Sequence, residues 1–384
     1  MQLLFESLFN GVAIGSVLLM AALGLAIVFG LMGVINLAHG ELIMLGAYTT
    51  YVVQLIFKLP LLAPIYNAYV LVAIPCAFVV SGVVGILLER TVIRRLYGSP
   101  LETLLATWGV SLILQQFVRS VPLAYAAGMV LFLVLGFSVP LFLPKTFLEG
   151  RQSRLVRLGG WAVSAFIGVL FAGGLASQIS RIAKATSRNV DVTAPKWMRG
   201  GLEWMDLTFP VPRLVIIVMT LIAVVGVIWF LNRSVWGIRI RAVTQNRSMS
   251  DCLGIPTDTV DVLTFGIGSG LAGVAGVAVS LLGSVGPNVG TSYIVGCFMV
   301  VVLGGVGNLL GTVLASFAIG LLTDLIGAGR LLTIWPDMPE PLAGGVEFFA
   351  TTSMAQVMVF ALIVVFLQFR PAGLFPQKGR MVEA

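Results

Sequence analysis

Long runs of apolar residues, separated by short polar breaks, make up most of the chain. Reading windows of about 19 residues predicts a helix for each run. The predicted helices cover residues 8–32, 37–57, 68–88, 102–118, 122–144, 158–178, 211–231, 260–284, 292–304, 309–327 and 353–369. A run of about 20 apolar residues can span the hydrocarbon core of a bilayer. The pattern predicts an all-α, polytopic membrane protein of about 10–11 transmembrane helices with broken or re-entrant segments, in a single domain over residues 1–384.

Composition strengthens this prediction. Of the 384 residues, 58% are hydrophobic and only 10% are charged, and the mean hydropathy is +1.04. A soluble domain carries about 25% charged residues. The three cysteines, Cys76, Cys252 and Cys297, lie far apart and form no CxxC motif, so we expect neither a disulfide nor a metal site.

Basic residues cluster between the apolar runs, which explains the net charge of +7 without nucleic acid. The clusters are Arg90, Arg94 and Arg95; Lys145, Arg151, Arg154 and Arg157; Arg233, Arg239, Arg241 and Arg247; and Arg370, Lys378 and Arg380. With eleven crossings all four fall on one side, which the positive-inside rule makes cytoplasmic. The exception is the loop at 179–212, whose basic residues fall on the outer side: Arg181, Lys184, Arg188, Lys196 and Arg199.

A polar break interrupts the first two runs at GVINLAHGE, residues 33–41. It contains Asn36, Glu41 and His39, the only histidine of the chain. A broken helix exposes backbone N–H and C=O groups, and ionisable residues within a membrane usually face a pathway or an internal partner. One interpretation is that the break lines a translocation route. The other is a short interfacial turn among lipid headgroups, with His39 capping a neighbouring helix.

A second break, LGGVGNLLG at 303–311, contains Gly305, Gly307 and Asn308. Repeated glycine bends a helix or admits another backbone, so this segment either frames a gate or serves close helix packing. GVINL at 33–37 and GVGNL at 305–309 form a faint echo, consistent with an internal repeat or with chance. The glycines of FGIGSGLAGVAG at 265–276 recur at helical spacing, and we interpret them as a packing face.

The longest polar segment on the predicted cytoplasmic side is the loop at 232–258. Residues 241–253 read as one short helix ended by Gly254 and Pro256, with Ala242, Met249 and Leu253 on one face. So thin an apolar stripe must rest on the membrane or in the groove of another protein. A solvated loop helix is the alternative.

Several motifs are absent from the sequence. No GxxxxGK[ST] loop occurs, so the chain cannot draw on ATP by itself, and no HExxH or GxSxG motif occurs. We therefore expect a protein that is not an enzyme, with no catalytic residues, metal site or cofactor.

Three stretches resemble the permease subunits of branched-chain amino acid ABC importers: VINLAHGELIMLGAY, RAVTQNRSMSDCLGI and VVVLGGVGNLLGT. LETLLATWGVSLILQQFVRS at 101–120 and RAVTQNRSMSDCLGIPT are more similar to the urea-transporting branch. The resemblance spans roughly 1–120, 187–330 and the final FRPAGLF. It implies a second homologous permease, two cytoplasmic ATP-binding subunits, a periplasmic binding protein and a bacterial inner membrane.

The resemblance also assigns residues. The family's coupling helix maps onto 241–253, which makes these the ATPase-coupling candidates: Arg241, Ala242, Gln245, Asn246, Met249, Leu253 and Gly254. The loop lacks the leading glutamate of many importers, so the detailed ATPase contacts differ. Residues 121–186 are an additional pair of apolar spans, for which we predict a peripheral helical hairpin that docks another subunit.

These observations favour an ATP-driven importer whose permease subunit carries urea. Urea is small and uncharged, so we expect Asn36 and Asn308 to contact it, while His39 and Glu41 pair with each other or with backbone to hold the break open. Gly305 and Gly307 complete the predicted pathway. The alternatives are the same machine carrying branched-chain or neutral amino acids, and a proton-coupled secondary transporter or channel that uses His39 and Glu41.

Overall fold

The computed structural model describes residues 2–60, 62–121, 123–142, 153–179, 189–204, 207–330 and 350–375. Each predicted apolar run coincides with a helix: α1 (Gln2–Met32), α2 (His39–Phe57), α3 (Tyr69–Thr91), α4 (Pro100–Ser120), α5 (Leu123–Phe142), α7 (Ser153–Ile179), α8 (Val211–Arg233), α11 (Thr257–Leu282), α12 (Val289–Gly304), α13 (Leu309–Gly327) and α16 (Thr352–Phe369). Within the described ranges, seven helices are long and apolar enough to cross a membrane. The polytopic helical fold is confirmed.

Shorter elements connect these helices. They are the 3₁₀ turns η1 (Ala63–Ala68), η2 (Ile93–Arg95) and η4 (Lys196–Met198), the short helices α9 (Val235–Gln245) and α10 (Arg247–Cys252), and the strands β1 (Gly201–Trp204) and β2 (Leu207–Pro210). The antiparallel β1–β2 ribbon was not predicted. Four-residue strands are too short to leave a periodic signal in the sequence.

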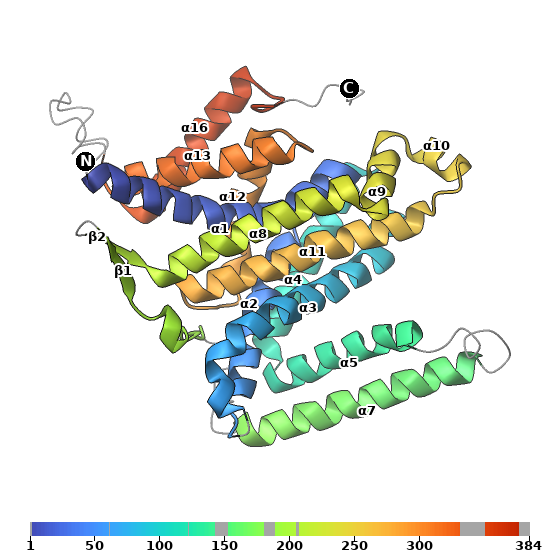
Figure 1. The fold of residues 1–384 in the computed structure, drawn as a ribbon. Helices are drawn as coiled ribbons and strands as arrows, with labels where there is room; N and C mark the ends of the chain where they lie inside the picture. The colour runs from blue at the N-terminus through green and yellow to red at the C-terminus, as the bar shows by residue number, and fades with distance from the viewer. Residues whose placement is uncertain are drawn as a thin grey trace.

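The centre of the bundle is formed by α1, α2 and α11 (Figure 1). The apolar window of α11 is 89% buried, whereas that of α4 is 17% buried, so α4 lies at the periphery. Small residues bring the central helices together: a Cβ atom on Gly24 of α1 would lie 2.1 Å from the Gly268 oxygen of α11. A Cβ on Gly46 of α2 would lie equally close to the Gly273 oxygen. The predicted packing role of the 265–276 glycines is confirmed.

The α5–α7 pair forms a separate hairpin at the edge of the molecule (Figure 1). Its two helices touch through Gly128 and Gly168, and Phe132 meets Trp161 edge to face at 5.3 Å. Two helices of a hairpin, α5 and α7, lie within the stretch 121–186, and the docking of another subunit by this hairpin stays a prediction. Most of the basic connection between its helices lies outside the described residues, including Lys145 and Arg151.

Two of the predicted cytoplasmic clusters lie at the same end of the bundle, where α9 and α10 also lie (Figure 1). Arg94, after α3, and Arg247, after α8, both pair with carboxylates at the start of α11. The N-terminus and the β1–β2 ribbon lie at the other end. Lys378 and Arg380 of the last cluster, and Arg181, Lys184 and Arg188 of the exceptional loop, lie outside the described residues.

Candidate translocation path and coupling segment

The first break is buried inside the bundle. Residues 33–38 leave the helical conformation, and Asn36, His39 and Glu41 are 0%, 0% and 1% exposed. His39 lies against Ala21 of α1. The stretch from Ala21 to Met32 rises about 16 Å along the helix axis. The chain therefore turns back alongside α1 before α2 begins, and protein encloses the break.

Each polar side chain of this break has one hydrogen-bond partner, on another helix for His39 and Glu41 and within the break for Asn36. The His39 ring contacts the Ala21 carbonyl oxygen through Nε2 at 3.0 Å, and Nε2–H is the donor. The Ser111 hydroxyl of α4 donates to Glu41 Oε1 at 3.1 Å. Asn36 Oδ1 accepts from the Ala38 N–H at 3.0 Å and shapes the turn locally. The structure thus gives His39 a backbone partner and Glu41 a hydroxyl partner.

Each of these side chains also has a second polar atom that makes no hydrogen bond. Within the described part of the chain, Asn36 Nδ2, His39 Nδ1 and Glu41 Oε2 are buried and have no hydrogen-bond partner. Leaving such groups unpaired costs about 1–3 kcal/mol each. The three atoms supply both donor and acceptor capacity, on side chains that contact α1, α4 and the break itself.

The wall opposite the break is a row of hydroxyls on α4 that the sequence analysis missed. Thr103, Thr107 and Ser111 recur every four residues and are all buried, although most of α4 is exposed. The Leu37 N–H donates to Thr107 Oγ1 at 3.2 Å. A spacing of four between hydroxyls in an otherwise apolar helix was the available signal, and it identifies the face that meets the break.

The start of α12 closes the other side of the break. Gly40 and Gly290 pack backbone to backbone, with a Cβ on Gly40 only 2.4 Å from the Gly290 oxygen. Asn288, just before α12, accepts hydrogen bonds from Gln115 and Arg119 of α4. The break is therefore enclosed by α1, α4 and the α11–α12 connection.

The second break has a different construction. Gly305 and Gly307 adopt φ of +99° and +87°, a region that favours glycine, so the predicted bend is present. Asn308 caps α13, because its Oδ1 accepts from the Gly311 N–H at 3.1 Å. The C-terminal FRPAGLF stretch covers this break: the Leu374 N–H donates to the Leu303 oxygen at 2.8 Å.

The two breaks lie at different levels of α1. His39 meets α1 at Gly24, whereas Gly307 meets it at Gly30, about 9 Å further along the helix axis. Asn308 and Gly307 instead line a cavity of about 510 Å³ together with Arg241 and Gln245 of α9. The structure thus brings two of the predicted pathway residues to the coupling segment rather than to Asn36.

The coupling segment is two helices, not the single helix predicted at 241–253. The chain is extended at Asn246, with φ of −154°, and the Asn246 side chain caps α10 by accepting from the Met249 N–H at 2.9 Å. An asparagine side chain competes with helical hydrogen bonding and favours such a cap, which explains the error. Gly254, with φ of +79°, follows α10 as predicted.

The exposed side of this segment carries two large apolar side chains among polar and charged ones. Met249 and Leu253 of the predicted stripe are 60% and 74% exposed, whereas Ala242 is half-buried. Ile240 and Val243 of α9 face the bundle and are buried. Two large side chains that project from the end of a membrane bundle form a surface suited to another protein's groove.

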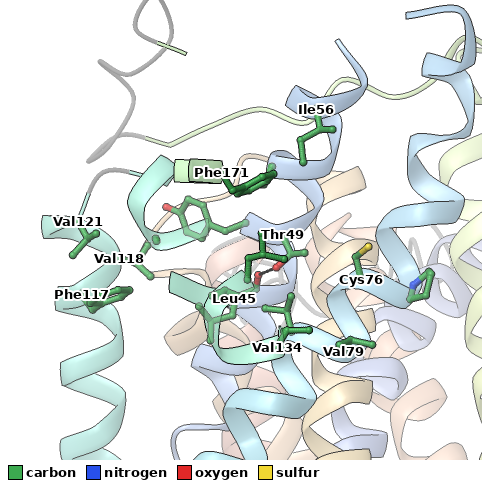
Figure 2. A pocket seen from close by; sticks show the side chains of 17 residues that line it. Leu45, Thr49, Ile56, Cys76, Val79, Phe117, Val118, Val121, Val134 and Phe171 are labelled. Carbon is green, nitrogen blue, oxygen red and sulfur yellow. Dashed lines mark hydrogen bonds between the residues drawn. The ribbon is translucent and has the colours of Figure 1, made fainter. Parts of the chain in front are cut away.

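Another cavity, with an almost wholly apolar lining, lies elsewhere. It has a volume of about 420 Å³ and lies among α2, α3, α4, α5 and α7, where Leu45, Thr49, Cys76, Val134 and Phe171 gather around it (Figure 2). Its lining is almost entirely hydrocarbon, which does not suit a small polar solute. The cavity instead marks where the α5–α7 hairpin meets the bundle.

Comparison with known proteins matches residues 7–367 to the family model described as branched-chain amino acid transport system / permease component. The chain is 26% identical over 375 residues to the high-affinity branched-chain amino acid transport system permease protein LivH of Salmonella typhimurium, covering 96% of this chain and 94% of the relative. It is 25% identical over 371 residues to BraD of Pseudomonas aeruginosa, a permease protein of the same kind of system, with the same coverage.

A more distant relative is the autoinducer 2 import system permease protein LsrC of Salmonella paratyphi B, 24% identical over 38% of this chain and 45% of the relative. No solved structure matches the chain. None of these matches carries the urea-type branch that the sequence analysis favoured. Because the match to the family model extends from residue 7 to residue 367, this protein belongs to the family of permease components of branched-chain amino acid transport systems.

Proposed function

We propose that this chain is the membrane permease of an ATP-driven importer that carries branched-chain amino acids. Its full-length relatives are named for that cargo, and the coverage of both chains supports the transfer. The observation that carries the proposal is the buried polar break at 36–41 together with the exposed α9–α10 segment. The first gives a solute partners inside the bundle, and the second gives a motor protein a place to bind.

In this proposal the partners are a second permease subunit, two cytoplasmic ATP-binding subunits and a periplasmic binding protein, in a bacterial inner membrane. Asn36, His39 and Glu41 line the path. Arg241, Ala242, Gln245, Asn246, Met249, Leu253 and Gly254 form the region that couples to the ATPases. Gly307 and Asn308, with Gly305 at the same break, form the exit on the coupling side, because Gly307 and Asn308 share a cavity with Arg241 and Gln245.

Urea is the second candidate cargo. The side chains around the first break are hydroxyls, an amide, an imidazole and one carboxyl group, and their hydrogen bonds run to neutral groups. A planar, uncharged solute with several N–H donors fits such partners. The stretches 101–120 and 241–257, which resemble the urea-type branch, favour the same cargo.

The two candidate cargoes are distinguished by measuring the ATPase activity of the reconstituted complex with its binding protein. Leucine and alanine are compared with urea at equal concentrations. Stimulation by leucine but not urea supports the first proposal. Stimulation by urea alone shows an ATP-driven importer whose cargo is urea instead. If no cargo stimulates hydrolysis, both proposals are contradicted.

A further inference from the structure

A cluster of charged residues joins α10 to the rest of the bundle at the coupling end. Arg247, the first residue of α10, pairs with Asp261 of α11 at 2.6 Å. Arg94 of η2 lies 3.4 Å from Glu89 and 3.3 Å from Asp258. The side chains of Glu89 and Asp261 are 0% and 5% exposed, so both buried carboxylates depend on an arginine from another segment.

Arg247 makes a second contact, with an aromatic ring. Its guanidinium lies 4.9 Å from the centroid of the Tyr97 ring. Burial raises the pKa of the Tyr97 hydroxyl, and Asp261 and Glu89 raise it further, so the ring remains a neutral phenol. A planar guanidinium over a neutral aromatic ring is attracted to the ring face, and lysine reproduces that arrangement less well.

Tyr97 belongs to the short connection that leads directly into α4. Thr103 in the first turn of α4 donates to the Leu96 oxygen at 3.0 Å and to the Ser99 oxygen at 2.9 Å. These bonds tie the connection to the hydroxyl face of α4. That same face continues to Thr107 and Ser111, which contact the first break.

The N-terminal part of α4 is held less firmly than the central helices. The outer side chains of α4 are exposed over the length of the helix: Leu101, Leu105, Trp108, Leu112 and Ile113. Hydrogen bonds through Thr107 and Ser111 connect its inner face to the break, whereas its last turn packs through Val118 in an apolar cluster with α2. A helix with one exposed side moves more easily than one buried in the core.

We propose that Arg247 and Tyr97 are positioning residues that carry displacement of the α9–α10 segment to α4, and through Thr107 and Ser111 to the polar break at 36–41. This inference rests on the proposed function, since it requires a motor protein that moves α9–α10. It assigns the link to one ring, one guanidinium and the hydroxyl face of one helix. Asp261 holds Arg247 in place under the ring.

The test compares Tyr97→Leu with Tyr97→Phe in the reconstituted complex. Tyr97→Leu removes the ring without leaving Asp261 unpaired. It should keep complex assembly and basal ATP hydrolysis but lower cargo uptake per ATP hydrolysed at least tenfold. Tyr97→Phe keeps the ring and should stay within twofold of wild type. Thr103→Val removes the hydrogen bonds that tie the Tyr97 connection to α4. It should lower cargo uptake per ATP hydrolysed as Tyr97→Leu does.

The control is Phe132→Leu in the α5–α7 hairpin. Phe132 meets Trp161 edge to face at 5.3 Å, so this variant removes an aromatic contact that lies outside both α4 and the α9–α10 segment. It should stay within twofold of wild type. A Tyr97→Leu complex that couples normally, or a Phe132→Leu complex that is equally uncoupled, overturns the link. A wild-type complex without cargo-stimulated hydrolysis instead contradicts the proposed function itself.

Discussion

Three polar side chains at one turn, Asn36, His39 and Glu41, are buried inside this membrane bundle. Each makes a hydrogen bond through one polar atom, while another buried polar atom of the same side chain has no partner. An ionisable group inside a membrane is rare and normally faces a partner or a path. At the residue scale, we therefore propose that the same side chains both build the break and offer hydrogen bonds to a passing solute.

Ser111→Ala tests the contact across the break. The substitution leaves Glu41 Oε1 buried without its donor, so we expect a loss of about 1–3 kcal/mol of stability together with reduced uptake. Thermal unfolding of the solubilised protein and cargo uptake measure the two effects. Ser292→Ala is the control, because Ser292 is exposed and bonds only within its own helix, and it should change stability by less than about 0.5 kcal/mol. Equal effects of the two variants would contradict the proposed contact.

At the scale of the element, close glycine contacts set the position of the break. Gly24 lets α1 approach α11 and also leaves room for the His39 ring, since a Cβ there would lie 2.8 Å from His39 Cε1. The backbone of Gly268 on the other side cannot move away as a side chain can. The fit of α1 to α11 and the placement of His39 are thus one structural feature.

Gly24→Ala should therefore destabilise the bundle by about 1–3 kcal/mol, as overpacking does, and displace His39. Gly226→Ala on α8 is the matched control, because a Cβ there meets no atom within 4 Å. Alanine in that helix should be neutral or stabilising by up to about 1 kcal/mol. Melting temperatures of the two purified variants measure the difference. A stable Gly24→Ala protein would show that the helices are not so tightly packed.

The α5–α7 hairpin is an element that lies apart from the proposed path. It meets the bundle across the apolar cavity, away from Asn36 and Asn308. Deletion of residues 123–187 with a short linker should leave a correctly inserted protein that retains cargo-stimulated ATP hydrolysis in the complex. Hydrolysis and membrane insertion are measured on the same preparation. An inserted deletion variant without stimulation would show that the hairpin takes part in transport or assembly of the motor.

Sequence patterns predicted elements better than they predicted contacts. Every apolar run became a helix, and both glycine-containing breaks interrupt helices, because hydropathy and glycine act locally. The role of Ser111 could not be read in this way, since its partner Glu41 lies 70 residues away. Asn246 was read as part of a helix because its capping bond is settled by the chain geometry around it. The separation of the two breaks that contain Asn36 and Asn308 likewise appears only in the structure, where the breaks contact α1 at different residues.

At the scale of the whole molecule, the ends of the bundle have different characters. One end carries α9 and α10 with the Arg94 and Arg247 ion pairs, and the other carries the N-terminus and the β1–β2 ribbon (Figure 1). The positive-inside rule predicts that the first end faces the cytoplasm. That orientation is required if α9–α10 binds ATP-hydrolysing subunits.

Cys252 reports this orientation without any substitution. It is exposed on α10, whereas Cys297 is buried and Cys76 is half-buried within a membrane span. A membrane-impermeant maleimide should label Cys252 in inside-out vesicles and leave it unlabelled in intact spheroplasts. Cys252→Ser is the control that assigns the signal. Labelling in spheroplasts would invert the predicted topology.

The most direct test of the account is uptake by proteoliposomes that contain either this chain alone or the full complex with its binding protein. The account predicts that the complex accumulates cargo only with ATP and that vanadate abolishes accumulation. The chain alone should show none, with or without a pH gradient. Uptake by the chain alone, driven by a pH gradient and insensitive to vanadate, would contradict the account and assign His39 and Glu41 to a proton-coupled transporter.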